Sequence, residues 1–170
     1  MPITIRVMHN GDWPAVRAVF QEGIDTGIAS LETRVPSWAD WDWGHLKVCR
    51  LVAVRQDVVV GWAALSPVSR RQAYAGVAEV SVYVAASARR QGVGRALLRQ
   101  LIDHSERAGL WTLQAVILAE NQASVALHRA CGFRLVGHRE KIGLRQGQWH
   151  DTVLMERRSP ALIFEDPGTR

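Results

Sequence analysis

The sequence has only two cysteines and no long apolar run. Two cysteines are too few for a disulfide framework. Cys49 and Cys131 also lack the spacing of metal ligands, which excludes a cysteine-based metal site. We expect both thiols to be reduced and buried, as in a cytoplasmic protein. No apolar run approaches the ~20 residues that a membrane-spanning helix needs, and Ile3–Val7 resembles a strand rather than a signal peptide. We therefore expect a cytoplasmic protein with no metal and no membrane contact.

Lysine is nearly absent. Of the 21 basic residues only Lys47 and Lys141 are lysines, and the formal net charge is +5. Arginine suits phosphate recognition because its forked donors match phosphate geometry. Nucleic-acid binding would need a basic face interleaved with exposed aromatic residues, whereas these arginines are spread along the chain. We expect no nucleic-acid partner and keep nucleic-acid binding as a minor alternative.

The length of 170 residues and a hydrophobic content of 48% predict one domain with a proper core. We place that domain at residues 1–158, with a flexible tail at 159–170. Apolar periodicity predicts helices from Asp12 to about Gly27, from Ser37 through Trp43, from the glycine loop to near Gly109, and over Ser124–Cys131. Strands are predicted at Ile3–Val7, Leu51–Arg55, Val58–Leu65, Val77–Val84, Thr112–Ile117, Phe133–Glu140 and Thr152–Glu156, with a turn at Gly143–Gly147.

A glycine loop lies between a predicted strand and an amphipathic helix. It reads Arg89-Arg90-Gln91-Gly92-Val93-Gly94-Arg95. Such a loop at a helix N-terminus presents free backbone N–H groups to an anion, and glycine lets a phosphate approach closely. The loop lacks the Gly-Lys-Ser/Thr ending of a P-loop, and it lacks the third glycine and the later acid of a dinucleotide site. We interpret it as a pyrophosphate site; a plain glycine turn with solvated arginines is the alternative.

Two further groups of polar residues are candidates for chemistry. Glu79 lies in an otherwise apolar strand, on the same face as Ser81 and Tyr83. It is either a solvent-exposed glutamate or a general base that accepts a proton from an amine. Asn121, Ser124 and His128 fall on one face of a predicted helix. They form either a polar wall of a binding site or, for His128, a surface histidine.

The loop pattern Arg/Gln-x-x-Gly-x-Gly/Ala resembles the coenzyme A loop of the GNAT superfamily of N-acetyltransferases. The run from Asn121 to His128, followed by Cys131-Gly132-Phe133, resembles the pantetheine-binding helix of that superfamily. The resemblance implies an α/β (α+β) fold: a mixed, mostly antiparallel central sheet with helices on both faces. It implies acetyl-CoA as cosubstrate, contacted by Val82, Tyr83, Val84, Arg89, Arg90, Gln91, Gly92, Val93, Gly94, Arg95, Asn121, Ser124 and His128.

The finer resemblance is to the GNAT branch that acetylates phosphinothricin and methionine sulfoximine. Four stretches carry it: Ala29–Thr33, Arg71–Tyr74, Ala78–Val84 and Gly147–Asp151. It implies a homodimer whose partner helps to shape the pocket, with Glu79 as base. The implied acceptor site contains Leu31, Arg71, Tyr74, Ser81, Trp149 and His150. Ser69 stands where some relatives carry a basic residue, and Leu31 where an aromatic can occur.

The expected reaction is direct transfer of an acetyl group from acetyl-CoA to an α-amine. Glu79 would accept the ammonium proton, and a backbone N–H near Val82 would stabilise the oxyanion. His128 occupies the position of a family tyrosine that protonates the departing thiolate; either His128 or a water would supply that proton. His150 is either catalytic, beside the amine, or packed against Trp149. Arsinothricin is an alternative acceptor, and a non-catalytic CoA-binding sensor is an alternative function.

Overall fold

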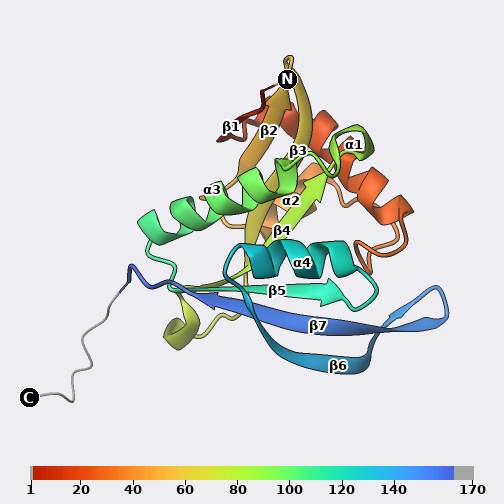
Figure 1. Ribbon diagram of the computed structural model, residues 1–170, viewed down its shortest axis with the longest axis vertical. Coiled ribbons are helices and arrows are strands. Elements are labelled where there is room, and N and C mark those ends of the chain that lie inside the picture. Colours follow the sequence, from red (N-terminus) through yellow and green to blue (C-terminus); the bar gives the residue numbers. More distant parts are fainter. Residues whose placement is uncertain (1, 163–170) are drawn as a thin grey trace, which may run out of the picture.

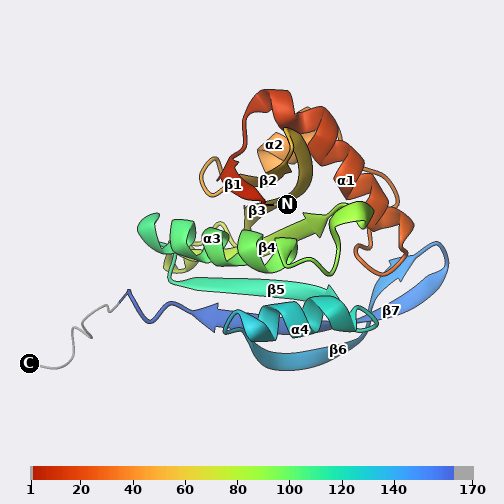
Figure 2. The ribbon, with the colours of Figure 1, turned by 45° about the horizontal axis from the view of Figure 1, so that its top comes forward.

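Seven strands form one mixed sheet with helices on both faces in the computed structural model, which describes residues 2–162 (Figures 1 and 2). The strand order is β1-β2-β3-β4-β5-β7-β6. The strands are β1 (Thr4–Val7), β2 (Leu51–Arg55), β3 (Val58–Pro67), β4 (Val77–Val84), β5 (Thr112–Leu118), β6 (Arg134–Arg145) and β7 (Gln148–Arg158). The helices are α1 (Trp13–Asp25), α2 (Trp38–Gly44), α3 (Val93–Arg107) and α4 (Gln122–Ala130). The predicted fold class and the predicted order of elements are confirmed.

The feature that positions the site is the junction of β4 and β5, the one parallel pair among the described strands. In this pair Val77 lies opposite Thr112, Ala78 opposite Leu113 and Glu79 opposite Gln114. Beyond Glu79 and Gln114 both strands continue, to Val84 and Leu118, without pairing to each other. Because β3 holds β4 and β7 holds β5, a gap opens between the two halves of the sheet.

The core fills both faces of the sheet. On the face of Tyr83, α1 packs Phe20 against Trp62 and Tyr83, with ring centroids 5.3 and 4.6 Å apart. On the opposite face, α3 buries Leu97, Leu98 and Leu101 completely. These three leucines share one stripe of the helix, the pattern that an amphipathic helix on a sheet requires. Burial of such side chains stabilises the fold by about 1.5–3 kcal/mol each.

Two predicted helix starts need correction. Asp12 makes no side-chain cap for α1; its carboxylate accepts hydrogen bonds from the guanidinium of Arg6, at 2.7 and 2.8 Å, and from the backbone N–H of His9. The stronger cationic partner takes the oxygens that a cap would use. Helix α4 begins at Gln122, before the predicted Ser124, because the Asn121 side chain caps it by accepting from the N–H of Ser124.

The C-terminal hairpin is longer than predicted. Strand β6 continues past its predicted end at Glu140 to Arg145, and the turn lies at Gln146 and Gly147, both with positive φ, within the predicted Gly143–Gly147 segment. The register shifts between Arg139 and Gly143, and this bulge breaks the period-2 pattern from which the strand end was predicted. Strand β7 likewise extends to Arg158.

The remaining predictions concern the cysteines and the chain end. Cys49 and Cys131 are free thiols, the first buried and the second half-buried; burial raises the pKa of the Cys49 thiol to about 11. Within residues 2–162 no helix combines the length and apolar character needed to cross a membrane. Of the predicted tail, residues 163–170 lie outside the described part, and Ser159 is buried, its N–H bonded to the Trp111 carbonyl.

Candidate active site

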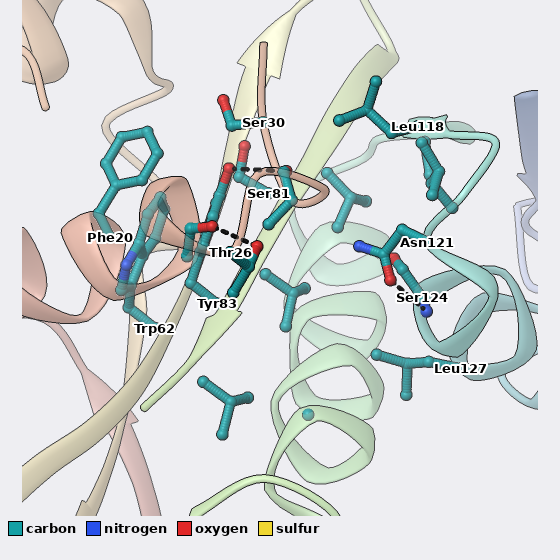
Figure 3. A pocket seen from close by; sticks show the side chains of 18 of the residues that line it. Phe20, Thr26, Ser30, Trp62, Ser81, Tyr83, Leu118, Asn121, Ser124 and Leu127 are labelled. Carbon is teal, nitrogen blue, oxygen red and sulfur yellow. Dashed lines mark hydrogen bonds between the residues drawn. The ribbon is translucent and has the colours of Figure 1, made fainter. Parts of the chain in front are cut away.

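The gap between β4 and β5 opens into a cavity of about 910 Å³. Figure 3 shows its two walls: Phe20, Trp62 and Tyr83 lie on one side of β4, and Asn121, Ser124 and Leu127 face them from the region of α4. One end of the cavity reaches the glycine loop before α3, and the other reaches Glu79 and the α1–α2 connection. We call these the cofactor end and the acceptor end, after the ligands that the sequence predicts.

The cofactor end is built mainly from backbone. Arg90 and Gly92 have φ values of 59° and 82°, and Gly92 is the N-cap of α3. The Ala96 N–H closes the first helical turn on the Gly92 carbonyl, so the N–H groups of the preceding turn lack helical acceptors. Val93, Gly94 and Arg95 all line the cavity there. An anion at this position would meet those N–H groups and the positive end of the α3 dipole.

The backbone of β4 contributes further polar groups. Ala85 N–H donates to the Val60 carbonyl, so it points toward β3. In an antiparallel pair the backbone groups of successive residues alternate in direction. The N–H and C=O of Val82 and Val84 therefore point away from β3 and into the gap, where the Val84 carbonyl accepts from Arg89 Nε, while those of Tyr83 point toward β3. The predicted oxyanion donor, the Val82 N–H, thus faces the cavity.

Helix α4 brings Asn121, Ser124 and His128 to the opposite wall, as predicted. The Asn121 carbonyl oxygen is used by the cap, so its NH₂ group is the donor left for a ligand. His128 Nδ1 lies 2.8 Å from the carbonyl oxygen of Ser124, and a carbonyl only accepts hydrogen bonds. Nδ1 must therefore carry the proton, and Nε2 of the neutral ring carries a lone pair.

This tautomer bears on the predicted role of His128 as an acid. The ring is 4% exposed, and burial lowers its pKa, which favours the neutral form. The neutral Nε2 has no proton to donate to a thiolate. Nε2 is also buried without a hydrogen-bond partner among the described residues. The structure thus corrects the prediction of His128 as proton donor to a potential hydrogen-bond acceptor.

Glu79 lies where β4 and β5 separate, and its side chain lines the cavity. Its Oε2 accepts a hydrogen bond of 2.7 Å from the side-chain amide of Gln114, directly opposite on β5. Within the described chain this is the one side-chain hydrogen bond to the Glu79 carboxylate. A half-buried carboxylate with a free oxygen, facing a cavity, can accept a proton from an amine.

Aromatic rings surround the acceptor end. Trp62 stacks on Tyr83 with centroids 4.9 Å apart, and Trp41 meets Trp62 edge-on at 5.6 Å. The Tyr83 hydroxyl donates to the Ala29 carbonyl at 3.3 Å, and burial raises the pKa of Tyr83 to about 12. Tyr83 therefore stays protonated at neutral pH.

Several predicted site residues lie outside the cavity of one chain. Arg71 and Tyr74 are exposed, with the guanidinium 5.6 Å from the Tyr74 ring centroid. Trp149 is 60% exposed, and strand alternation directs it away from the face of His150. His150 pairs with Glu120 at 2.8 Å instead of lining the cavity, so its predicted place beside the amine is not reproduced in one chain. The Gln91 amide donates to the Ser87 carbonyl, also outside the cavity lining.

Other predicted residues do line the cavity, and some lining residues escaped prediction. Leu31, Ser81, Tyr83, Val84, Arg89 and Arg90 line it as expected. Among the lining residues that were missed are Trp41, His45, Trp62 and Thr152. Gln114, the partner of Glu79, was missed as well. Gln114 carried a usable signal, because it is the one polar interior residue of β5, and Glu79 is the one charged residue of β4. The others look like core residues until packing is known.

Comparison with known proteins assigns the fold to a family. The model of the acetyltransferase (GNAT) family matches residues 14–133. The chain belongs to the GNAT acetyltransferase family. Within residues 2–162 no group of three or more His, Cys, Asp or Glu side chains could hold a metal ion.

Individual relatives share most of the chain. A phosphinothricin N-acetyltransferase from Alcaligenes faecalis is 38% identical over 161 residues, covering 91% of this GNAT chain and 81% of its own length. An L-methionine sulfoximine/L-methionine sulfone acetyltransferase from Pseudomonas aeruginosa is 35% identical, with 92% and 94% covered. The crystal structure of a phosphinothricin acetyltransferase from Sinorhizobium meliloti in complex with acetyl-CoA matches with a TM-score of 0.83 and 32% identity, covering 93% and 89%.

Proposed function

We propose that this GNAT enzyme transfers an acetyl group from acetyl-CoA to the α-amine of a small acidic amino-acid analogue of the phosphinothricin or methionine sulfoximine type. The observation that carries the proposal is the position of Glu79, at the point where β4 and β5 separate and at the acceptor end of the cavity. The names of the relatives support this acceptor class. Arsinothricin, with a similar acidic tail, belongs to the same class.

In this proposal Glu79 prepares the nucleophile. An α-ammonium group has no lone pair at neutral pH, and the free oxygen of the Glu79 carboxylate accepts its proton, directly or through water. The neutral amine then attacks the thioester carbonyl carbon. The new C–N bond forms as the carbonyl π electrons move to oxygen, and the Val82 N–H, which faces the gap, stabilises that oxyanion.

Collapse of the tetrahedral intermediate breaks the C–S bond and releases the CoA thiolate. The second proton that the amine nitrogen loses as the amide forms passes through a water molecule to the thiolate, because Nε2 of neutral His128 carries a lone pair and has no proton to give. His128 then belongs to the binding site: Nε2 accepts a hydrogen bond from an amide N–H of the pantetheine arm. The NH₂ group of Asn121 donates to a pantetheine carbonyl. No acetyl-cysteine intermediate is invoked, since neither Cys49 nor Cys131 lines the cavity.

The residues of the cavity fit acetyl-CoA. Its pyrophosphate would meet the Val93, Gly94 and Arg95 N–H groups and the charges of Arg89 and Arg90. The amides of its pantetheine arm would meet the unpaired backbone groups of β4, as an added strand does. The unpartnered Nε2 of His128 on the other wall supports this placement.

A second copy of the chain completes the acceptor site in this proposal. Arg71 and Tyr74, which the resemblance assigns to the acidic group of the acceptor, are exposed and outside the cavity of one chain. A homodimer or closure of their loop would bring such groups to the acceptor. We place the enzyme in the cytoplasm, where free thiols such as Cys49 persist.

One observation favours a second candidate acceptor. The carboxylates of Glu32 and Asp40 line the acceptor end, and no arginine outside the cofactor loop lines the described cavity. If no partner copy supplies Arg71, this end attracts a cationic amine rather than an acidic one.

The deciding experiment measures CoA thiol release from acetyl-CoA with L-phosphinothricin, L-methionine sulfoximine and a cationic amine, alongside sedimentation velocity for the oligomeric state. We expect turnover with the acidic acceptors, and a loss of about 10²–10³-fold in kcat for Glu79→Gln at neutral pH. Activity of the variant should partly recover at high pH, where the amine is already neutral. Turnover with the cationic amine alone would favour the second candidate, and tight acetyl-CoA binding without any turnover would favour a CoA-binding sensor.

A further inference from the structure

We propose that Gln114 is a positioning residue, which orients the Glu79 carboxylate for proton transfer. The inference rests on the proposed role of Glu79 as general base. Gln114 lies directly opposite Glu79 in the last pair that β4 and β5 form before they separate. Its amide nitrogen is 2.7 Å from Glu79 Oε2.

The strand geometry makes this contact specific. Residues opposite each other in a sheet present their side chains on the same face, so Gln114 lies on the face of Glu79, Ser81 and Tyr83. Val116 and Leu118, the next residues of β5 on that face, are apolar. A half-buried amide in an apolar strand costs free energy unless it is hydrogen-bonded. The bond to Glu79 accounts for glutamine at this position.

The hydrogen bond leaves the carboxylate ready to react. Oε2 is occupied by the Gln114 donor, so Oε1 is the oxygen that can face the amine. The Gln114 Nε2–H donor makes a charge-assisted hydrogen bond with the carboxylate, which orients it more strongly than a bond between neutral groups would. It also limits rotation of the Glu79 side chain, which keeps the base within reach of the proton.

An amide is also a milder partner than the cations that hold other carboxylates of this chain. Asp12 is bound by Arg6, Asp42 by Arg50 and Lys47, and Glu106 by Arg157. Each of these cationic contacts lowers the pKa of the carboxylate. A carboxylate held so firmly in its charged form is a poor proton acceptor, whereas a neutral donor orients Glu79 without a full opposing charge.

Other titratable groups on this face set the background for the test. The acceptor end of the cavity is lined by Glu32, Asp40 and His45. Glu156 lies opposite Gln114 on β7 and is paired with Arg134. None of them is hydrogen-bonded to Glu79 or Gln114 in the described chain, so a change at Gln114 reports on Glu79 first.

The test compares pH profiles of kcat/KM for the acceptor in three variants. Gln114→Leu removes the donor at similar volume, and Gln114→Glu places a second carboxylate beside Glu79. We expect kcat/KM at neutral pH to fall about tenfold in Gln114→Leu, because the base is no longer held within reach of the proton. In Gln114→Glu we expect the acidic limb of the profile to move up, because the added carboxylate places a like charge beside Glu79. The KM for acetyl-CoA should not change. Gln21→Leu is the matched control, because Gln21 makes the same amide–carboxylate bond, to Asp25 at 2.8 Å, on the exposed surface.

A double-variant cycle separates this inference from the proposed function. In a Glu79→Gln background Gln114→Leu should have no further effect on kcat, because the group that Gln114 positions is gone. Unchanged kcat/KM in Gln114→Leu and an unmoved pH profile in Gln114→Glu, with Glu79→Gln still impaired, would overturn the positioning role and leave the base in place. Full activity of Glu79→Gln would instead overturn the base, and the positioning role with it.

Discussion

The two ends of the cavity are built in opposite ways. The cofactor end comes from one continuous stretch, residues 89–95, and consists largely of backbone N–H groups and exposed arginines. The acceptor end combines side chains from β3, β4, α2, the α1–α2 connection and β7. Backbone recognition needs the right local conformation, whereas side-chain recognition needs distant elements to pack. One end is therefore visible in the sequence, and the other appears only in the fold.

The two ends also differ in how they join the core. Trp41 and Trp62 of the acceptor end are each 1% exposed and belong to the hydrophobic core, whereas Arg90 and Gly92 of the cofactor end are exposed. The acceptor wall is thus part of what stabilises the protein, and the cofactor loop is a surface feature. Substitutions should affect stability at the first and ligand affinity at the second.

The largest expected effect is that of Trp62→Ala. Trp62 contacts Phe20, Trp41 and Tyr83, so its loss leaves a cavity and should lower the free energy of unfolding by about 3–5 kcal/mol. Trp43→Ala is the matched control, since Trp43 is 80% exposed and its loss should change stability by less than about 0.5 kcal/mol. Urea denaturation measures both. Equal losses of unfolding free energy in the two variants would contradict the role of the acceptor wall in stabilising the protein.

At the cofactor end the sharper comparison is between two glycines. Gly92 and Gly109 have φ values of 82° and 80°, and an added Cβ meets nothing within 4 Å at either position. Alanine should cost about 1–2 kcal/mol of stability at each, because an L-residue is strained in this region. Only Gly92→Ala should raise the KM for acetyl-CoA, by about fivefold, which is roughly 1 kcal/mol. Steady-state kinetics and urea denaturation distinguish the two effects, and a similar rise in KM for Gly109→Ala would refute the loop as the site.

The smallest expected effect is the pH dependence of acetyl-CoA binding through His128. Burial lowers the pKa of His128, so the neutral acceptor form holds above the ordinary histidine pKa of ~6.5. As the pH falls below that value and the folded ring gains a proton, Nε2 loses its lone pair and affinity drops. The contribution of the neutral His128 ring to the free energy of unfolding depends on pH in the same direction. It is fully present above pH ~6.5 and decreases below that pH, because His128 in the unfolded chain has the higher pKa and binds the proton first.

Calorimetric titration with acetyl-CoA between pH 5 and pH 8 tests this. His128→Leu should weaken binding about fivefold at pH 8, the value of one hydrogen bond, and by less at pH 5. His150→Leu is the control, since His150 lies outside the cavity and pairs with Glu120. Titration of the cofactor phosphates is common to all variants. A constant ratio between wild type and His128→Leu across the range would disprove the acceptor role.

Much of the fold followed from local patterns in the sequence. The alternation of Val77–Val84 and the leucine stripe of α3 predicted a strand and a helix where the structure has them. Two local predictions were wrong: Asp12 binds Arg6 rather than capping α1, and β6, with its bulge, runs past the predicted end at Glu140 to Arg145. The hairpin turn lies within the predicted Gly143–Gly147. Local propensity does not include a partner that arrives from another element.

The same distinction between local pattern and tertiary contact applies to the candidate site. By itself the sequence determined the glycine loop, the polar positions of Glu79 and Asn121, and the family pattern, because each depends on neighbours in the chain. Only the tertiary structure decided that β4 and β5 separate after Glu79, that Gln114 meets its carboxylate, and that Trp41 and Trp62 wall the acceptor end. It also decided the tautomer of His128, through the Ser124 carbonyl. These outcomes depend on strand register and side-chain packing between distant segments, and no single stretch of sequence contains both partners.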